Sequence, residues 1–136
     1  MRRDTRDALA ARLRRFDRLV EVGIGRRTDL AAALADAGAT VVATDLRERP
    51  VPPGVTFVRD DVTDPDPSVY AGADAVYALN LPPELHRPAR DAALAADAAF
   101  LFTTLGAEPP AVPAASETLP GETLYRAGRD PMPENP

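Results

Sequence analysis

Short apolar strands alternate with helical segments along most of this chain, and this alternation constrains its fold more than any other feature. Strands are expected at residues 18–23, 40–45, 55–60, 73–80 and 98–106, and helical patterns at residues 28–38 and 82–97. Near-continuous apolar strands joined by helices form a parallel sheet that is covered on both faces. Right-handed crossovers then predict an α/β, doubly wound, Rossmann-like sheet, mostly parallel, with the strand order 3-2-1-4-5.

The two ends of the chain depart from this alternation. A charged helix is predicted over residues 1–17, with Asp4 as its cap, and residues 107–121 form a proline-rich connection with few helix signals. The last strand, within residues 121–128, has no helix before it, so we expect it to run antiparallel at the edge of the sheet beside strand five. Residues 129–136 read as a disordered tail. The sequence therefore predicts a single domain over residues 1–128.

Several classes of protein are disfavoured by composition. The chain has no cysteine, which rules out disulfides and thiolate metal sites and favours a cytoplasmic location. No apolar run approaches the ~18–20 residues of a membrane span, and the charged start does not resemble a signal peptide. No spacing of His, Asp and Glu suggests a metal site, so we expect none.

The charge of the chain is acidic but unevenly spread. The net charge is −5 and all 16 basic residues are arginine, a composition that resembles haloarchaeal proteins, although a GC-rich genome would also favour arginine over lysine. Residues 1–18 hold seven Arg and three Asp. Because the two signs interleave, we interpret this start as a solvated helix face and do not expect nucleic-acid binding.

A glycine loop follows the first strand, where a doubly wound sheet of this order reverses direction and binds its ligands. Gly23 and Gly25 permit positive φ and close approach of a ligand, although a tight turn without a ligand would also use them. Asp45 ends the second strand, where a carboxylate can accept the hydroxyls of an adenosine ribose. Asp61 and Val62 follow the third strand, where a carboxylate and a backbone N–H could bracket an adenine ring.

Glu21 distinguishes between two kinds of cofactor. It stands two residues before Gly23, inside an apolar run, and a carboxylate there suits a ligand that carries an amino group and a sulfonium. It would be a poor neighbour for the pyrophosphate of a nicotinamide cofactor, and Thr28 stands where the dinucleotide pattern has its third glycine. These residues disfavour a nicotinamide-dependent redox domain.

Together, Glu21-Val22-Gly23-Ile24-Gly25, Asp45 and Asp61 resemble the class I S-adenosylmethionine-dependent methyltransferases. With Gly25-Arg26, TDL at 44–46 and PPEL at 82–85, the chain is more similar still to a small archaeal family of minimal methyltransferase-like domains without an assigned function. The resemblance covers roughly residues 15–106. It implies that S-adenosylmethionine contacts Glu21, Gly23, Gly25, Asp45, Asp61 and Val62. Arg27 replaces a further glycine that methyltransferases often carry, and Arg26 and Arg27 are expected to be solvated or salt-paired.

The catalytic residues are not defined by this pattern. Amino-group methyltransferases carry Asn or Asp directly before Pro-Pro and an aromatic residue, whereas here Leu81 separates Asn80 from the prolines and Glu84 replaces the aromatic residue. Asn80, Glu84 and His86 are weak candidates, because methyl transfer depends mainly on alignment of the reactants. We predict an S-adenosylmethionine-binding protein. If it also catalyses transfer, it is a minimal methyltransferase with an unknown acceptor. The alternative is a non-catalytic, degenerate Rossmann module that binds a nucleotide-like ligand or a partner protein. An edge strand and a helix with an apolar face make a homodimer possible.

Overall fold

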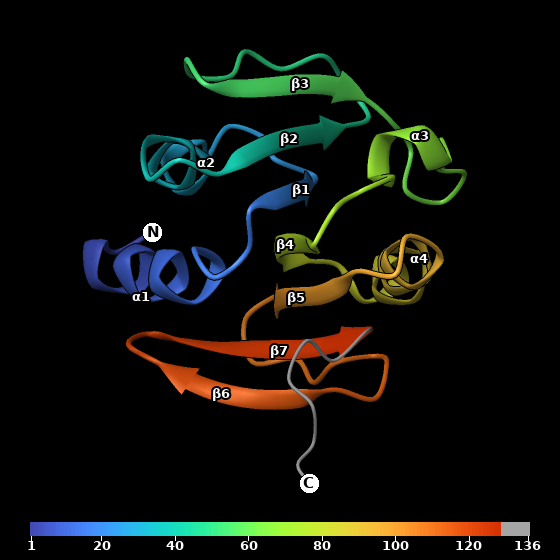
Figure 1. Cartoon of the computed structure of the whole chain (residues 1–136). Helices are drawn as coiled ribbons and strands as arrows, with labels where there is room; N and C mark the ends of the chain where they lie inside the picture. The colour runs from blue at the N-terminus through green and yellow to red at the C-terminus, as the bar shows by residue number, and fades with distance from the viewer. Residues whose placement is uncertain (129–136) are drawn as a thin grey trace, which may run out of the picture.

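Helices cover both faces of a seven-stranded sheet in the computed structural model, which describes residues 1–128 (Figure 1). The strand order is β3-β2-β1-β4-β5-β7-β6. The helices are α1 (Arg3–Leu13), α2 (Asp29–Asp36), α3 (Pro67–Tyr70) and α4 (Pro83–Ala95). The strands are β1 (Arg18–Val22), β2 (Thr40–Asp45), β3 (Val55–Arg59), β4 (Ala75–Leu81), β5 (Ala99–Thr104), β6 (Ala115–Leu119) and β7 (Glu122–Gly128).

The five parallel strands have the predicted order. β1 pairs in parallel with both β2 and β4, so the chain reverses its direction of travel across the sheet at β1. β3 and β5 extend the sheet outwards from β2 and β4, also in parallel. The prediction of a doubly wound α/β sheet is confirmed, and it places the end of β1 at the point where such sheets bind ligands.

Each face of the sheet has its own core (Figure 1). On one face, Leu9 and Leu13 of α1 and Leu30 and Leu34 of α2 are buried against the sheet. On the other face α3 and α4 pack against the sheet, and α4 presents alanines there, among them Ala89 and Ala93. Small side chains let that helix lie close to the bulky Phe100 and Phe102 of β5.

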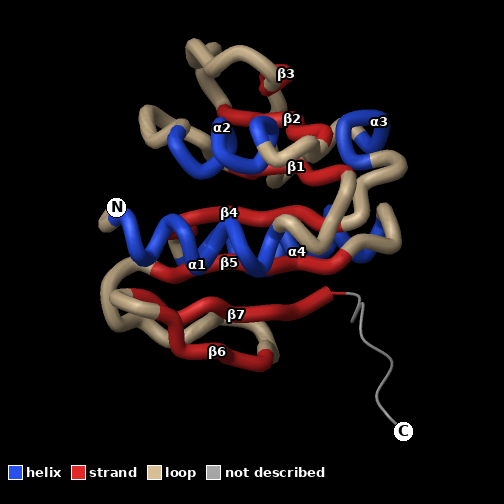
Figure 2. The backbone as a smooth tube through the Cα atoms, turned by 60° about the vertical axis from the view of Figure 1, so that its left-hand side comes forward, coloured by secondary structure: helices blue, strands red, loops and turns tan. Residues whose placement is uncertain are grey.

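The C-terminal part of the sheet differs from the prediction. β7 runs antiparallel beside β5 as expected, but it is not the edge strand, because β6 pairs antiparallel with its outer side (Figure 2). β6 lies inside the stretch 107–121 that was expected to be a connection. Only Leu119 of this strand is buried, so the strand lacks the apolar alternation by which strands are recognised.

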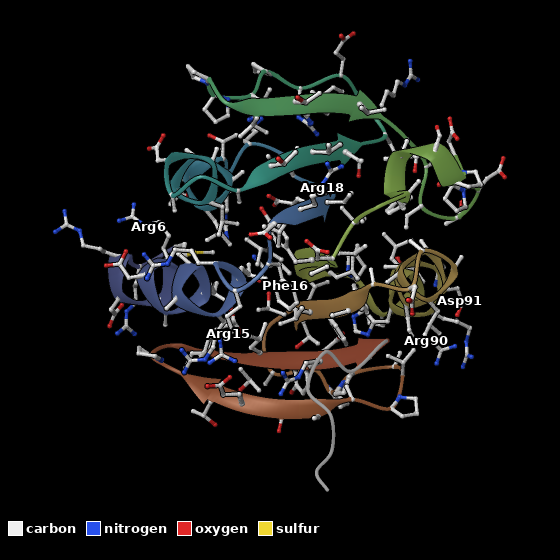
Figure 3. The ribbon with its side chains drawn as sticks, in the orientation of Figure 1. Arg6, Arg15, Phe16, Arg18, Arg90 and Asp91 are labelled. Carbon is white, nitrogen blue, oxygen red and sulfur yellow. The ribbon has the colours of Figure 1, made fainter. Side chains whose placement is uncertain are left out.

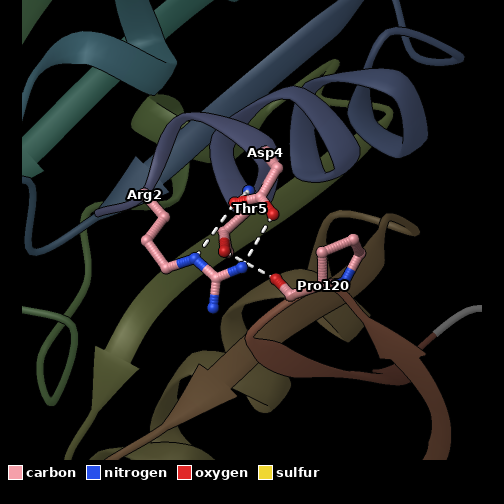
Figure 4. A network of polar contacts seen from close by, with 4 residues as sticks. All are labelled: Arg2, Asp4, Thr5 and Pro120. Carbon is pink, nitrogen blue, oxygen red and sulfur yellow. Dashed lines mark hydrogen bonds and ion pairs between the residues drawn. The ribbon is translucent and has the colours of Figure 1, made fainter.

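The N-terminal helix is shorter than predicted and is anchored at its start. It ends at Leu13 instead of continuing to residue 17, and Asp4 lies in its first turn instead of capping it. Thr5 donates a hydrogen bond of 2.6 Å from Oγ1 to the carbonyl oxygen of Pro120, in the turn between β6 and β7 (Figure 4). In Figure 2 the helix lies in front of β4 and β5 and runs along the same direction as these strands.

The short helix α3 was not predicted, although Asp66 caps it by accepting from the Ser68 N–H and Pro67 stands in its first turn, both standard start signals. Within the described part of the chain, every helix falls short of the length and apolar character needed to cross a bilayer. The predicted tail at 129–136 lies outside the described residues.

Candidate functional site

The glycine loop after β1 is held by the end of β2. The N–H groups of Gly23 and Ile24 both donate to the carbonyl oxygen of Thr44, at 2.9 and 3.0 Å. The N–H of Gly25 donates to Oδ2 of Asp45 at 2.8 Å. Gly23 and Gly25 have φ angles of 71° and 57°, which a residue with a Cβ adopts only at a cost. A Cβ on Gly23 would meet no heavy atom within 4 Å, so the glycine leaves open space in front of the backbone.

Asp45 therefore has a role that the sequence did not indicate, because it fixes the loop itself. Its Oδ1 also accepts from the N–H of Arg47 at 3.3 Å, and Nε of Arg49 lies 3.6 Å from its Oδ2. The side chain of Asp45 is 13% exposed. An ionised carboxylate has about four lone-pair positions, so two backbone N–H bonds leave acceptor capacity for a ligand.

Glu21 is buried on β1 and interacts with the neighbouring strand. It is 1% exposed, and the hydroxyl of Tyr77 on β4 donates to its Oε1 at 2.7 Å. Burial raises the pKa of Glu21 to about 8, against the opposing effect of the Tyr77 hydrogen bond, and Asp29 raises it further. A carboxyl group with this pKa is mostly protonated at neutral pH.

The two acids lie on the same face of the sheet. Glu21 is paired in register with Ala43 of β2, and Asp45 is two residues beyond Ala43. Side chains two apart on a strand point to the same side, so both carboxyl groups belong to the face covered by α1 and α2.

The end of β4 contributes the third part of the site. The pairing of β4 with β5 shifts register between Ala78 and Leu81, which marks a bulge. Within this irregular stretch Asn80 has a φ of 51°, and its N–H donates to Oγ1 of Thr103 at 2.8 Å. Bulges and positive φ at non-glycine residues are frequent beside functional sites, where they re-aim a side chain.

These parts meet in a cavity of about 170 Å³ at the carboxyl end of the parallel strands. It is lined by Glu21, Gly23, Ile24, Gly25, Arg26, Arg27, Leu79 and Asn80. The structure thus brings Glu21, both glycines and the weak candidate Asn80 together, with Asp45 bonded to the loop that forms the wall. The volume is below the ~300–1,000 Å³ of enclosed ligand pockets, so a nucleoside-sized ligand would lie across an open edge.

Arg26 and Arg27, which were expected to be solvated or salt-paired, line the rim of this cavity. Both are exposed, and neither forms an ion pair within residues 1–128. Asp29, two residues after Arg27, has its Oδ2 4.0 Å from Nη1 of Arg6. The rim is therefore positive, directly above a buried acid.

Asp61 and Val62 are not brought to the cavity. Asp61 is exposed and accepts from the N–H and the hydroxyl of Thr63, at 2.9 and 2.7 Å, and these two bonds lower its pKa. Val62 is buried in the core on the face of α3 and α4. Their predicted contact with adenine stays a prediction.

The other two catalytic candidates are also placed away from the cavity. His86 is fully buried, its Nε2 lies 2.8 Å from the carbonyl oxygen of Leu81, and its Nδ1 accepts from the N–H of Ala111 at 2.9 Å. With both nitrogens engaged, His86 ties α4 to the segment before β6 and has no nitrogen free for a substrate. Glu84 is exposed in the first turn of α4. No cluster of potential metal ligands occurs within residues 1–128.

Two supporting residues were not identified from the sequence. Tyr77 on β4 is the first, because its hydroxyl is the hydrogen-bond partner of Glu21. Thr44 holds the loop through its carbonyl oxygen and donates from Oγ1 to the carbonyl oxygen of Glu21 at 3.0 Å. The order of the strands places Tyr77 next to Glu21, so the first of these contacts could have been anticipated.

The fold is that of the class I S-adenosylmethionine-dependent methyltransferases. An RNA methyltransferase from Salinibacter ruber, in complex with S-adenosylhomocysteine, matches 99% of this chain and 97% of its own, with a TM-score of 0.63 and 19% identity. Magnesium protoporphyrin IX methyltransferase from Synechocystis, with S-adenosylmethionine bound, matches 93% of this chain and 78% of its own, with a TM-score of 0.65 and 18% identity. This chain spans only about half of the N-terminal domain of EvdMO1, which it also matches.

The chain belongs to the uncharacterised protein family UPF0146, whose model matches residues 5–125. A UPF0146 protein from Halobacterium salinarum is 57% identical over 122 residues, which are 90% of this chain and 95% of that protein. The predicted similarity to a small archaeal family of methyltransferase-like domains is confirmed.

Proposed function

We propose that this protein binds S-adenosylmethionine, or its demethylated product, at the glycine loop after β1. The observation that carries the proposal is the joint placement of Glu21 and Asp45: one lines the cavity, and the other holds the loop through the 2.8 Å bond to Gly25. The methyltransferases of the same fold whose structures contain this cofactor or product support the proposal.

The glycine loop does not present free N–H groups to a pyrophosphate. The N–H groups of Gly23, Ile24 and Gly25 are all bonded to the end of β2, so they are not free to bind phosphate oxygens. Glu21 supplies the matching negative charge when it ionises, because a nearby cation stabilises the carboxylate and lowers its pKa. These features also disfavour the nicotinamide alternative.

Asp45 is the residue that would hold a ribose. Its remaining lone pairs can accept hydroxyl groups, and its fixed position removes the entropic cost of ordering the side chain on binding. The finer assignment of adenine to Asp61 and Val62 has no support from the geometry, and we leave it out of the proposal.

Beyond binding, the protein would act as a methyltransferase that uses the bound cofactor as its methyl donor. The bound cofactor supplies an electrophilic methyl group on a sulfonium, and the contribution of the chain is to position it beside the acceptor. Asn80 is the first residue of the stretch that resembles the amino-group methyltransferase motif, in which Leu81 separates it from the prolines. It lies at the bulge of β4 and lines the cavity. We propose it as the residue that faces an acceptor.

Binding without transfer is a second candidate function, and one observation favours it. His86 is locked into the fold, so the titratable groups at the cavity reduce to Glu21 and the two arginines at the rim. A module with this site could sense or sequester the cofactor. Transfer of a labelled methyl group to any small-molecule or macromolecular acceptor would exclude this alternative.

Calorimetric titration in molar KCl tests the proposal. We expect saturable binding of S-adenosylmethionine and S-adenosylhomocysteine and much weaker binding of NAD. Asp45→Asn should weaken binding about tenfold, since a charged acceptor is lost. Asp64→Asn is the matched control, because Asp64 is exposed and lies away from the cavity. Absence of heat at millimolar ligand would refute the proposal.

A further inference from the structure

A cavity larger than the one at the glycine loop lies elsewhere in the fold. It has a volume of about 530 Å³, within the range of small-molecule pockets, and it opens between the end of α1 and the strands β5, β7 and β6. It shares no lining residue with the cavity at the loop. Arg15 and Phe16, just after α1, mark its position in Figure 3.

This cavity is set towards the opposite end of the sheet. Arg15 and Phe16 precede β1, so they lie where the parallel strands begin. Arg126 of β7 is paired with Leu101 of β5 and with Ala115 of β6, so these residues share the face that α1 covers. The glycine-loop cavity is at the other end of the same strands, so the two cavities are separate.

Three guanidinium groups surround one carboxylate in this cavity. Nε of Arg12 donates to Oε2 of Glu117 at 2.7 Å, and this bond is the main reason that the pKa of Glu117 is lowered. The charges of Arg126 and Arg15 lower that pKa further. Neither Arg15 nor Arg126 forms a hydrogen bond or an ion pair with any residue from 1 to 128. The cavity therefore has a net charge of +2 in a chain whose net charge is −5.

Stabilisation of the fold does not explain all of this charge. Basic residues near the C-terminus of α1 interact favourably with the helix dipole, which accounts for Arg12 and Arg15. Arg126 comes from β7, so the helix dipole does not account for it, and the single carboxylate of Glu117 offsets only one of the three positive charges. An anion that enters the cavity would offset the remaining positive charge.

The floor of the cavity is apolar. Leu101 and Leu124 are both buried, with 4% and 5% of their surface exposed, and Phe16 forms a half-buried side wall. A ligand that occupies the cavity would therefore place a hydrocarbon or ring against the leucines and a negative group between Arg15 and Arg126.

We propose that the cavity between α1 and the β5–β7–β6 strands binds a small organic anion with an apolar body and a terminal carboxylate or phosphate group. Arg15 and Arg126 bind the anionic group, Leu101 and Leu124 contact the apolar body, and Glu117 holds Arg12 in place. The site does not depend on the cofactor-binding proposal, because its residues and its ligand chemistry are separate.

Chemical-shift mapping on the ¹⁵N-labelled full chain tests this site. The probes are octanoate, octyl phosphate and uncharged octanol, with a short poly-glutamate peptide as the macromolecular comparison. We expect one or both octyl anions to cause saturable shifts at residues 12–16, 115–117 and 124–126, with affinity about three- to tenfold above octanol. The stronger of the two anions identifies the carboxylate or the phosphate as the preferred group.

Two variants separate the site from general surface charge. Arg126→Gln should weaken binding of the octyl anion about three- to tenfold, because one charged donor is lost. Arg14→Gln changes the same charge at an exposed residue next to the site that does not line it, so it should leave binding unchanged. The proposal would be overturned if octanol and the anions bound equally well, or if both variants lost the same affinity. It would also be overturned if the shifts were confined to residues 23–27, or if poly-glutamate alone bound.

Discussion

The buried acid on β1 makes the stability of this protein depend on pH in a way that one substitution should remove. Glu21 has a pKa of about 8 in the folded protein and an ordinary value of 4.5. Because the folded state favours the protonated form, the contribution of Glu21 to stability is fully present below pH 4.5. It is lost progressively as pH rises to about 8. The free energy of unfolding should fall by up to about 1.4 kcal/mol per pH unit in this window.

Glu21→Gln keeps the size of the side chain and an acceptor for the Tyr77 hydroxyl but cannot ionise. Near pH 4.5 the two proteins should differ little. At pH 7 the variant should be more stable by about 3 kcal/mol, and above pH 8 by about 5 kcal/mol, as upper estimates from the pKa difference.

Denaturant unfolding of both proteins at several pH values from about 5 to 8.5 measures this difference, and other titrating groups cancel between them. Glu84→Gln is the matched control, because Glu84 is exposed. A stability difference between wild type and Glu21→Gln that stays constant over the whole range would refute the assignment of a raised pKa to Glu21.

Four further outcomes are expected. Gly25→Ala should lower the free energy of unfolding by about 1–2 kcal/mol in denaturant titrations, because its φ of 57° disfavours a Cβ. His86→Ala should cost about 2–4 kcal/mol by the same measurement, since two buried hydrogen bonds and the packing on Phe102 are lost. Binding of S-adenosylmethionine near pH 7 should release protons from Glu21, so calorimetric heats should differ between phosphate and Tris buffers; equal heats would contradict this. Thermal melting should occur at a higher temperature in molar KCl than at low salt if the acidic, lysine-free composition is an adaptation to salt.

The sheet could be predicted because its signals are local. Val41, Val42 and the apolar residues of β4 and β5 mark buried strands, and the helices between strands dictate parallel pairing and strand order. β6 escaped prediction because an exposed edge strand needs no apolar pattern, and only Leu119 in it is buried. Its pairing with β7 depends on the tight turn at Pro120 and Gly121, not on side-chain periodicity.

The site could be predicted only in outline. The glycines and the two acids follow from strand ends and loop composition, which sequence records directly. The partners of those residues are long-range: the Tyr77 hydroxyl on Glu21 joins positions 56 residues apart, and the Ala111 N–H on His86 joins positions 25 apart. Contacts of this kind depend on how strands and loops pack in three dimensions, and a single sequence does not specify them.

The most direct test of the central claim is to map S-adenosylhomocysteine binding on the ¹⁵N-labelled protein. The account predicts saturable shifts concentrated at the amides of Gly23, Gly25 and Asp45 and at Asn80, with little change in the cavity beside α1. Saturable shifts at the α1 cavity alone, or no shifts at millimolar ligand, would contradict it.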